Sequence, residues 1–82
     1  MIWYDAKQCV PDKLGQTGSV EVLCKVRTKD GFCDHAVLRF DENGWWWMYL
    51  PRLGPAFNGG WVGIGDMKVL EWTYIEEKEV VK

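Results

Sequence analysis

Apolar side chains recur at every second position in two neighbouring segments of the chain, with one interruption, at Asp34. In residues 19–27 the alternating positions are Val20, Val22, Cys24 and Val26. In residues 32–41 they are Phe32, Ala36, Leu38 and Phe40. A period of two is typical of a β-strand with one buried side, so the pattern predicts two half-buried strands.

The loop between these two strands fixes their register. A three-residue loop from Lys29 to Gly31 pairs Thr28 with Phe32 and brings the two apolar sets together, with Val22 beside Leu38. The last residue of such a loop adopts the left-handed backbone conformation, which glycine tolerates, and Gly31 stands at this position. We therefore expect an antiparallel hairpin in this register.

A second turn follows at Asn43-Gly44, the strongest short signal for a two-residue hairpin. This turn would pair Phe40 with Trp47 and Leu38 with Tyr49, and would place those aromatic rings in the core. It would also turn Trp46 and Met48 to the opposite face of the sheet.

That opposite face carries an apolar row of its own in the same registers, made of Leu23, Val37 and Leu50. A sheet with one solvated face should not carry such a row. We expect the N-terminal segment, the following loop or a partner to cover it.

The rest of the chain adds one strand to this hairpin core. Residues 3–12 are expected to form a short helical turn that Pro11 closes, because proline disfavours helix at the residue before it. Residues 51–66 hold five glycines and two prolines and are expected to form a long loop. Residues 67–75 have the composition of a fourth strand.

These elements predict a mainly β fold, with α+β as the alternative. The expected architecture is a small antiparallel sheet of three to four strands with a short N-terminal helical turn. Residues 1–82 are expected to form a single domain with a β core over 19–75 and a charged, frayed tail over 76–82. Hydrophobic residues make up 48% of the chain and six are tryptophans, which is enough for one small core and too little chain for two.

Charge and cysteine content narrow the classes of partner and compartment. The formal net charge is −2 and no run of basic residues occurs, which argues against nucleic acid as the default partner. No apolar run approaches the ~20 residues that span a bilayer, so no membrane association is expected. Three cysteines without a C-x-x-C pair indicate reduced thiols in a cytoplasm rather than a disulfide framework.

No constellation of residues predicts catalysis. His35 is the only histidine, and Cys33 shares its face of the strand at a distance of roughly 6–7 Å, too far for direct proton transfer. These two residues are also too few to hold a metal ion. The glycine-rich run 59–65 lacks the Lys-Ser/Thr of a phosphate-binding loop. We therefore expect no enzyme, no metal site and no cofactor.

The remaining candidate is a recognition surface built on aromatic side chains. Trp, Tyr and Arg are enriched at binding hot spots. The expected surface comprises Trp46, Met48, Arg52, Phe57 and Trp61. It would bind a protein or a second copy of the chain. Three alternatives remain: stacking on a sugar or on single-stranded nucleic acid, a small second core under a folded-back loop, and an enzyme.

A set of short motifs is spread along the chain: Trp3, Pro11-Asp12, Val22-Leu23, Phe40, Trp45-Trp46 and Val69-Leu70-Glu71-Trp72. With these motifs the chain resembles a known family of small phage and prophage proteins, domain-of-unknown-function family number 551. Two positions depart from the family pattern. Val10 stands in place of a leucine, and residues 73–77 lack the closing prolines. The resemblance implies a cytoplasmic protein encoded by a bacterium or a phage, and it implies no particular activity.

Overall fold

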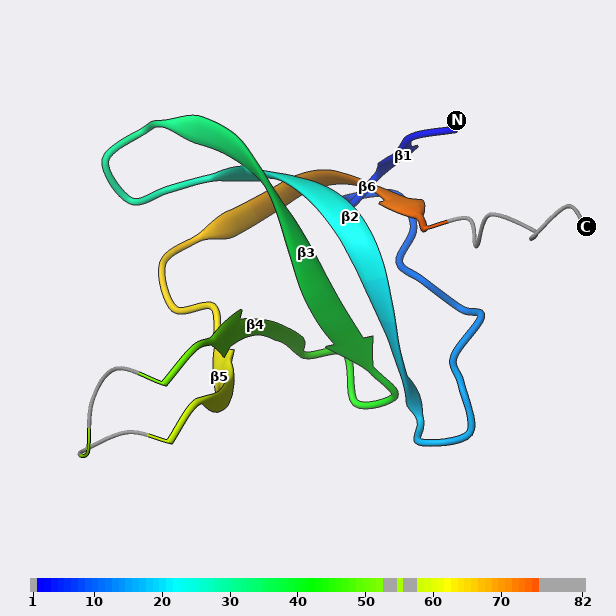
Figure 1. Ribbon diagram of the computed structural model, residues 1–82. Helices are drawn as coiled ribbons and strands as arrows, with labels where there is room; N and C mark the ends of the chain where they lie inside the picture. Colours follow the sequence, from blue (N-terminus) through cyan, green and yellow to red (C-terminus); the bar gives the residue numbers. More distant parts are fainter. Residues whose placement is uncertain (1, 53–54, 56–57, 76–82) are drawn as a thin grey trace, which may run out of the picture.

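A six-stranded antiparallel sheet forms the whole of the described structure, which is a computed structural model covering residues 2–52, 55 and 58–75 (Figure 1). In chain order the strands are β1 (Tyr4–Asp5), β2 (Ser19–Arg27), β3 (Cys33–Asp41), β4 (Trp46–Leu50), β5 (Gly60–Gly63) and β6 (Lys68–Tyr74). Their order in the sheet is β1-β6-β2-β3-β4-β5. The described residues contain no helix, and so none that could cross a bilayer.

The mainly β class is confirmed, but the expected number of strands and the N-terminal helical turn are wrong. The segment after β1 makes a single hydrogen-bonded turn, in which the amides of Gln8 and Cys9 both donate to the carbonyl of Asp5 at 3.0 Å. β1 itself exists because Tyr4 pairs with Trp72 far along the chain. That long-range contact leaves no trace in the local pattern.

The expected long loop over 51–66 is also interrupted by a strand, β5. Its register pairs Tyr49 with Trp61 and Met48 with Val62. The fourth strand expected over 67–75 is confirmed as β6, and it joins the sheet beside β2 rather than beside β4.

The hairpin of β2 and β3 has the expected register. Val22 lies opposite Leu38, and Cys24 lies opposite Ala36. The amide of Thr28 donates to the carbonyl of Phe32 at 2.8 Å, and Gly31 has a φ of 88°. The three-residue loop therefore forms as its sequence predicts.

The hairpin of β3 and β4 is shifted by one residue from the expected register. Its loop has three residues rather than two, because Asp41 closes it: the Asp41 amide donates to the Trp45 carbonyl at 3.1 Å. Gly44, with a φ of 85°, takes the left-handed position at the end of this loop. Phe40 consequently pairs with Trp46 instead of the expected Trp47.

This shift exchanges the two faces of β4, since neighbouring residues of a strand point to opposite sides. Trp46 and Met48 pack against the buried core, although the sequence pattern turned them away from it. Trp47 and Tyr49 lie on the other face, although the pattern placed them in the core. We call the face with the buried core the inner face and the face with Trp47 and Tyr49 the outer face.

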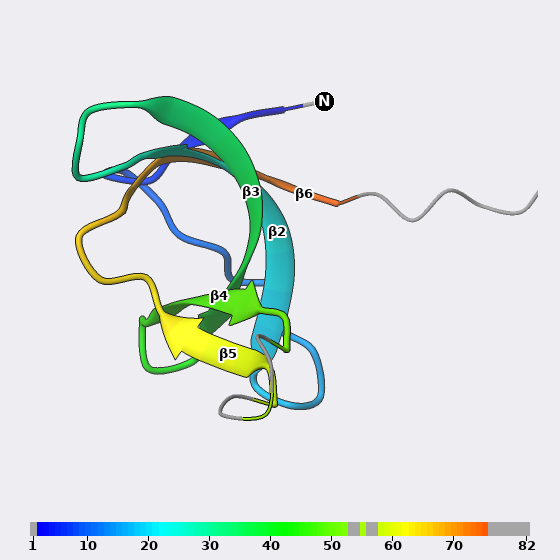
Figure 2. The same cartoon turned by 60° about the vertical axis from the view of Figure 1, so that its left-hand side comes forward.

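The inner face holds the core, and the sheet curls around it (Figure 2). The buried apolar side chains are Val22, Cys24, Val26, Leu38, Phe40 and Trp72.

Only four residues connect β5 to β6, yet four strand spacings separate these strands in the sheet. A flat sheet would put them about 19 Å apart. An extended connection would reach only about 17 Å, and this one also makes a turn, so the sheet has to bend.

The N-terminal segment is fastened to the inner face by two hydrogen bonds, whereas Trp3 at its start packs on the outer face against Lys25 and His35. The Trp72 indole donates to the carbonyl of Cys9 at 3.0 Å, and the Tyr74 hydroxyl donates to the Asp12 carboxylate at 2.9 Å. The outer face keeps its apolar row, in which Val37 is 45% exposed and Tyr49, which takes the expected place of Leu50, is 56% exposed.

Candidate functional site on the outer face

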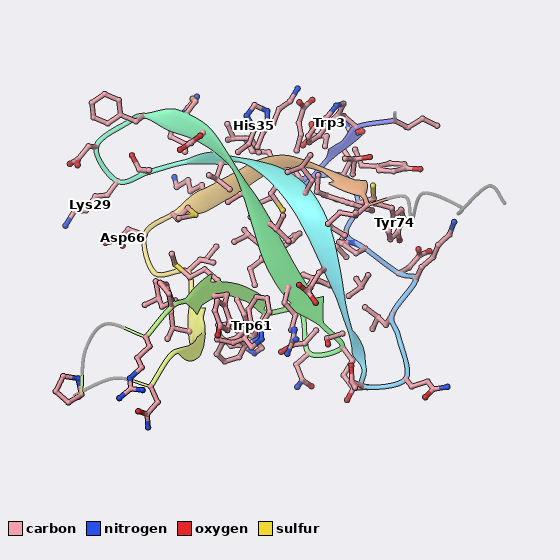
Figure 3. All side chains as sticks on the ribbon, in the orientation of Figure 1. Trp3, Lys29, His35, Trp61, Asp66 and Tyr74 are labelled. Carbon is pink, nitrogen blue, oxygen red and sulfur yellow. The ribbon has the colours of Figure 1, made fainter. Side chains whose placement is uncertain are left out.

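A groove of about 310 Å³ opens on the outer face where β3, β4 and β5 meet. The side chains that line it are Thr17, Ser19, Arg39, Asp41, Trp47 and Trp61. We call it the outer groove. Figure 3 shows Trp61 at β5, well separated from His35 and Trp3 at the other end of the sheet.

Strand pairing brings the aromatic side chains of the groove together. Arg39 lies opposite Trp47 in the β3–β4 pair, and Tyr49 lies opposite Trp61 in the β4–β5 pair. The rings of Tyr49 and Trp61 meet edge to face with centroids 5.4 Å apart, an arrangement that aromatic pairs favour. Tyr49 therefore extends the aromatic surface beyond the groove itself.

Arg39 reaches across β4 and lies on the ring of Trp61. Its guanidinium carbon is 4.1 Å from the ring centroid, a cation–π contact. Within the part of the chain that the structure describes, the Arg39 guanidinium makes one ion pair, with the Glu21 carboxylate at 4.0 Å. Guanidinium is a planar fork of five N–H donors, so most of its donors stay available to a ligand.

Asp41, by contrast, uses its carboxylate within the protein. Oδ1 accepts from the amides of Asn43 and Trp45 at 2.9 Å, and Oδ2 accepts from the Trp47 indole at 2.8 Å. These donors, the Trp45 amide foremost, hold the pKa of the Asp41 carboxyl below its ordinary value. The same bonds fix the orientation of Trp47 and close the β3–β4 loop.

The lowered pKa makes a component of the stability depend on pH. The folded protein favours the ionised form of Asp41. The contribution of Asp41 to the free energy of unfolding is therefore complete above the ordinary aspartate pKa of about 3.9, and it is lost as the pH falls through the lower pKa of the folded protein. We expect Asp41→Asn to be less stable than wild type near pH 7 and the difference to shrink in acid. Urea unfolding of both proteins between pH 7 and pH 2 measures it, and a difference independent of pH would contradict this assignment.

The structure separates the residues expected to form the recognition surface. Trp61 lies in the outer groove, whereas Trp46 and Met48 lie on the inner face. Arg52 is exposed after the end of β4, and Phe57 lies outside the described residues.

Three side chains of the outer aromatic surface were not among the expected site residues: Arg39, Trp47 and Tyr49. Asp41 is the sequence signal that could have identified Trp47 and Tyr49. Aspartate favours the first position of a type I turn, and a three-residue loop that follows Asp41 turns both aromatic side chains to the outer face.

Other reactive side chains lie apart from this groove. His35 is exposed and packs edge to face against Trp3 with centroids 6.0 Å apart, and Cys33 is exposed. Burial raises the pKa of the Cys24 thiol to about 12, which keeps it protonated and unreactive near neutral pH. Among the described residues, no three side chains of His, Cys, Asp or Glu gather into a potential metal site.

No protein-family model, curated protein or solved structure matches this chain significantly. The resemblance to the phage family therefore stays a prediction. Any inference about function depends on the chemistry of the outer face alone.

Proposed function

We propose that this chain is a non-enzymatic protein-binding module that contacts its partner through the outer groove and the neighbouring Tyr49. The observation that supports this proposal is the aromatic surface itself. Trp47, Tyr49 and Trp61 lie together on a part of the outer face that is well separated from Trp3 (Figure 3), and exposed apolar patches on small domains often mark partner sites.

The ionisable groups of the groove favour binding over catalysis. Asp41 is held as an ionised carboxylate by internal donors, which makes it a weak base. The Arg39 guanidinium can bind a ligand through its planar fork of N–H donors. Neither group is paired with a nucleophile in the groove, so the arrangement suits recognition.

A capture experiment with matched variants tests this proposal. We would tag the wild-type chain and Tyr49→Ala/Trp61→Ala, and compare what each retains from a nuclease-treated bacterial lysate. Phe32→Ala/Trp45→Ala is the matched control, since these side chains are 72% and 65% exposed at the hairpin tips, away from the groove. We expect one protein to be retained by wild type and by the control and to be lost from the groove variant.

Loss of that protein from the hairpin-tip control alone would move the binding surface away from the groove. Equal retention by all three chains would contradict the proposal. Circular dichroism of each variant establishes that the sheet is intact.

A sugar ligand is the second candidate function. Two indole rings beside the hydroxyls of Thr17 and Ser19 suit a ligand that combines flat apolar faces with hydroxyl groups. Single-stranded nucleic acid would use the same stacking, but it normally needs a cationic groove, and here Arg39 is the only cation in the lining. If soluble glycans compete with capture of the partner, the sugar is favoured. If binding falls steeply as the salt concentration rises, single-stranded nucleic acid is favoured.

The resemblance to family number 551 supports a bacterial or phage origin and a cytoplasmic location, and we include both in the proposal. Self-association through the same face is a variant of it. Sedimentation of the purified chain separates the two, because a second copy as partner predicts a dimer and a different protein as partner predicts a monomer.

A further inference from the structure

β5 is an edge strand of the sheet: it pairs with β4 along one edge, and no strand in the described part of the chain pairs with its other edge. An edge strand presents unpaired backbone N–H and C=O groups that can accept an extended segment of another chain. The edge lies directly beside the outer groove, because Trp61 belongs to both.

The hydrogen bonds of the β3–β4 hairpin identify which groups of β5 point outward. Asp41 and Trp45 are hydrogen-bonded partners, and such pairs alternate along an antiparallel ladder. Trp47 therefore bonds toward β3 and Met48 toward β5. It follows that Val62 bonds toward β4, whereas the N–H and C=O groups of Trp61 and Gly63 point away from the sheet.

β5 is a short strand of four residues, but it lacks the other devices that normally block pairing at an edge. Its sequence, Gly60 to Gly63, contains no charge and no proline, and its register with β4 shows no bulge. The opposite edge differs, since β1 has only two residues and one of them is Asp5. Of the two edges, β5 is the one open to an added strand.

The groove indicates the chemistry of that strand. A residue paired with Trp61 on the outward side would place its side chain on the outer face, next to the Trp61 ring. The Arg39 guanidinium lies on this ring, with donors to spare and its nearest carboxylate 4.0 Å away. Asp41 has less hydrogen-bonding capacity left for a ligand, because three internal donors already bind its oxygens. Arg39 is therefore the charged group of the groove that keeps hydrogen-bonding capacity for a ligand beside β5.

We propose that β5 accepts an extended segment of the partner protein as a seventh strand, and that an acidic side chain of this segment, opposite Trp61, pairs with Arg39. This inference rests on the proposed function, because the same face has to be the binding surface. It adds a mode of recognition, main-chain pairing, and a charge on the partner.

Synthetic strand peptides test both parts. The probe is acetyl-Thr-Val-Glu-Val-Thr-amide, compared with peptides carrying Gln or Lys in place of Glu, with binding followed by NMR shifts of the Trp61 and Gly63 amides. We expect the Glu peptide to bind about tenfold more tightly than the Lys peptide, the effect of a charge-assisted pair. Arg39→Gln should abolish this preference while leaving residual binding.

N-methylated peptides test main-chain pairing without altering the protein. Methylation of the amide that faces β5 should abolish binding, and methylation of an amide that faces away should not. Equal binding of both methylated peptides, or a preference for Glu that survives Arg39→Gln, would overturn the inference.

Failure of this inference and failure of the proposed function give different results. If none of the peptides binds while the Tyr49→Ala/Trp61→Ala variant still loses its captured protein, strand addition is wrong and the proposed function stands. If the purified chain sediments as a dimer that Tyr49→Ala/Trp61→Ala dissociates and Arg39→Gln leaves intact, a second copy occupies this surface and the acidic partner is excluded.

Discussion

Replacing Trp72 with alanine is expected to lower the free energy of unfolding by about 3–5 kcal/mol. The side chain is 2% exposed and stacks on Tyr4 with ring centroids 4.6 Å apart. Its indole donates to the carbonyl of Cys9, so the substitution removes core packing and one anchor of the N-terminal segment together. Domains of this size have only several kcal/mol of stability, and the variant should be largely unfolded at 37 °C.

Urea unfolding followed by circular dichroism measures this loss. Trp45→Ala is the control, because this tryptophan is 65% exposed at the β3–β4 hairpin, and we expect it to change stability by about 0.5 kcal/mol or less. A Trp72→Ala variant as stable as Trp45→Ala would contradict the position of the core.

The second large effect comes from Trp46, which lies on the inner face. Its ring packs against Phe40 with centroids 4.6 Å apart and contacts the buried core. Because Trp46 is only half-buried, we expect Trp46→Ala to cost about 2–3 kcal/mol, below the range for a fully buried tryptophan. Tyr49→Ala, on the outer face and 56% exposed, should cost about 1 kcal/mol or less, mainly its contact with Trp61.

This pair of variants distinguishes the observed register from the one that the Asn43-Gly44 turn suggests. In the suggested register Tyr49 is a core residue and Trp46 is not, so the order of the two losses would be reversed. Chemical denaturation of both variants under the same conditions decides between the two registers.

Local patterns could predict the strands that alternate and the loop that carries an unambiguous signal. β2 and β3 alternate apolar and polar residues over most of their length, and Gly31 fits the end of a three-residue loop, so both the elements and their register were correct. β1 and β5 could not be predicted in this way, because each is a short segment stabilised by partners distant in the sequence, Trp72 for β1 and the β4 strand for β5.

The prediction of the candidate site failed for the residues of β4 because the β3–β4 register is shifted by one residue from the expected one. Asn43-Gly44 fits a two-residue turn, but the Asp41 carboxylate accepts from two amides of the loop and stabilises a three-residue turn instead. The aromatic residues of β4 then change faces as a set. Trp61 could be recognised as a candidate from its glycine-rich context, whereas Arg39 could be assigned only when the structure placed it on the Trp61 ring.

The register of β3 and β4 is the central claim, because it alone places Trp47 and Tyr49 on the outer face. Residues paired without hydrogen bonds bring their Cα atoms closest in an antiparallel ladder, which gives strong NOEs between their Hα protons. We therefore expect strong Hα–Hα NOEs between Phe40 and Trp46 and between Leu38 and Met48. Strong Hα–Hα NOEs between Asp41 and Trp46 and between Arg39 and Met48 in their place would indicate the two-residue turn. That register would return Trp47 and Tyr49 to the core and contradict the outer groove.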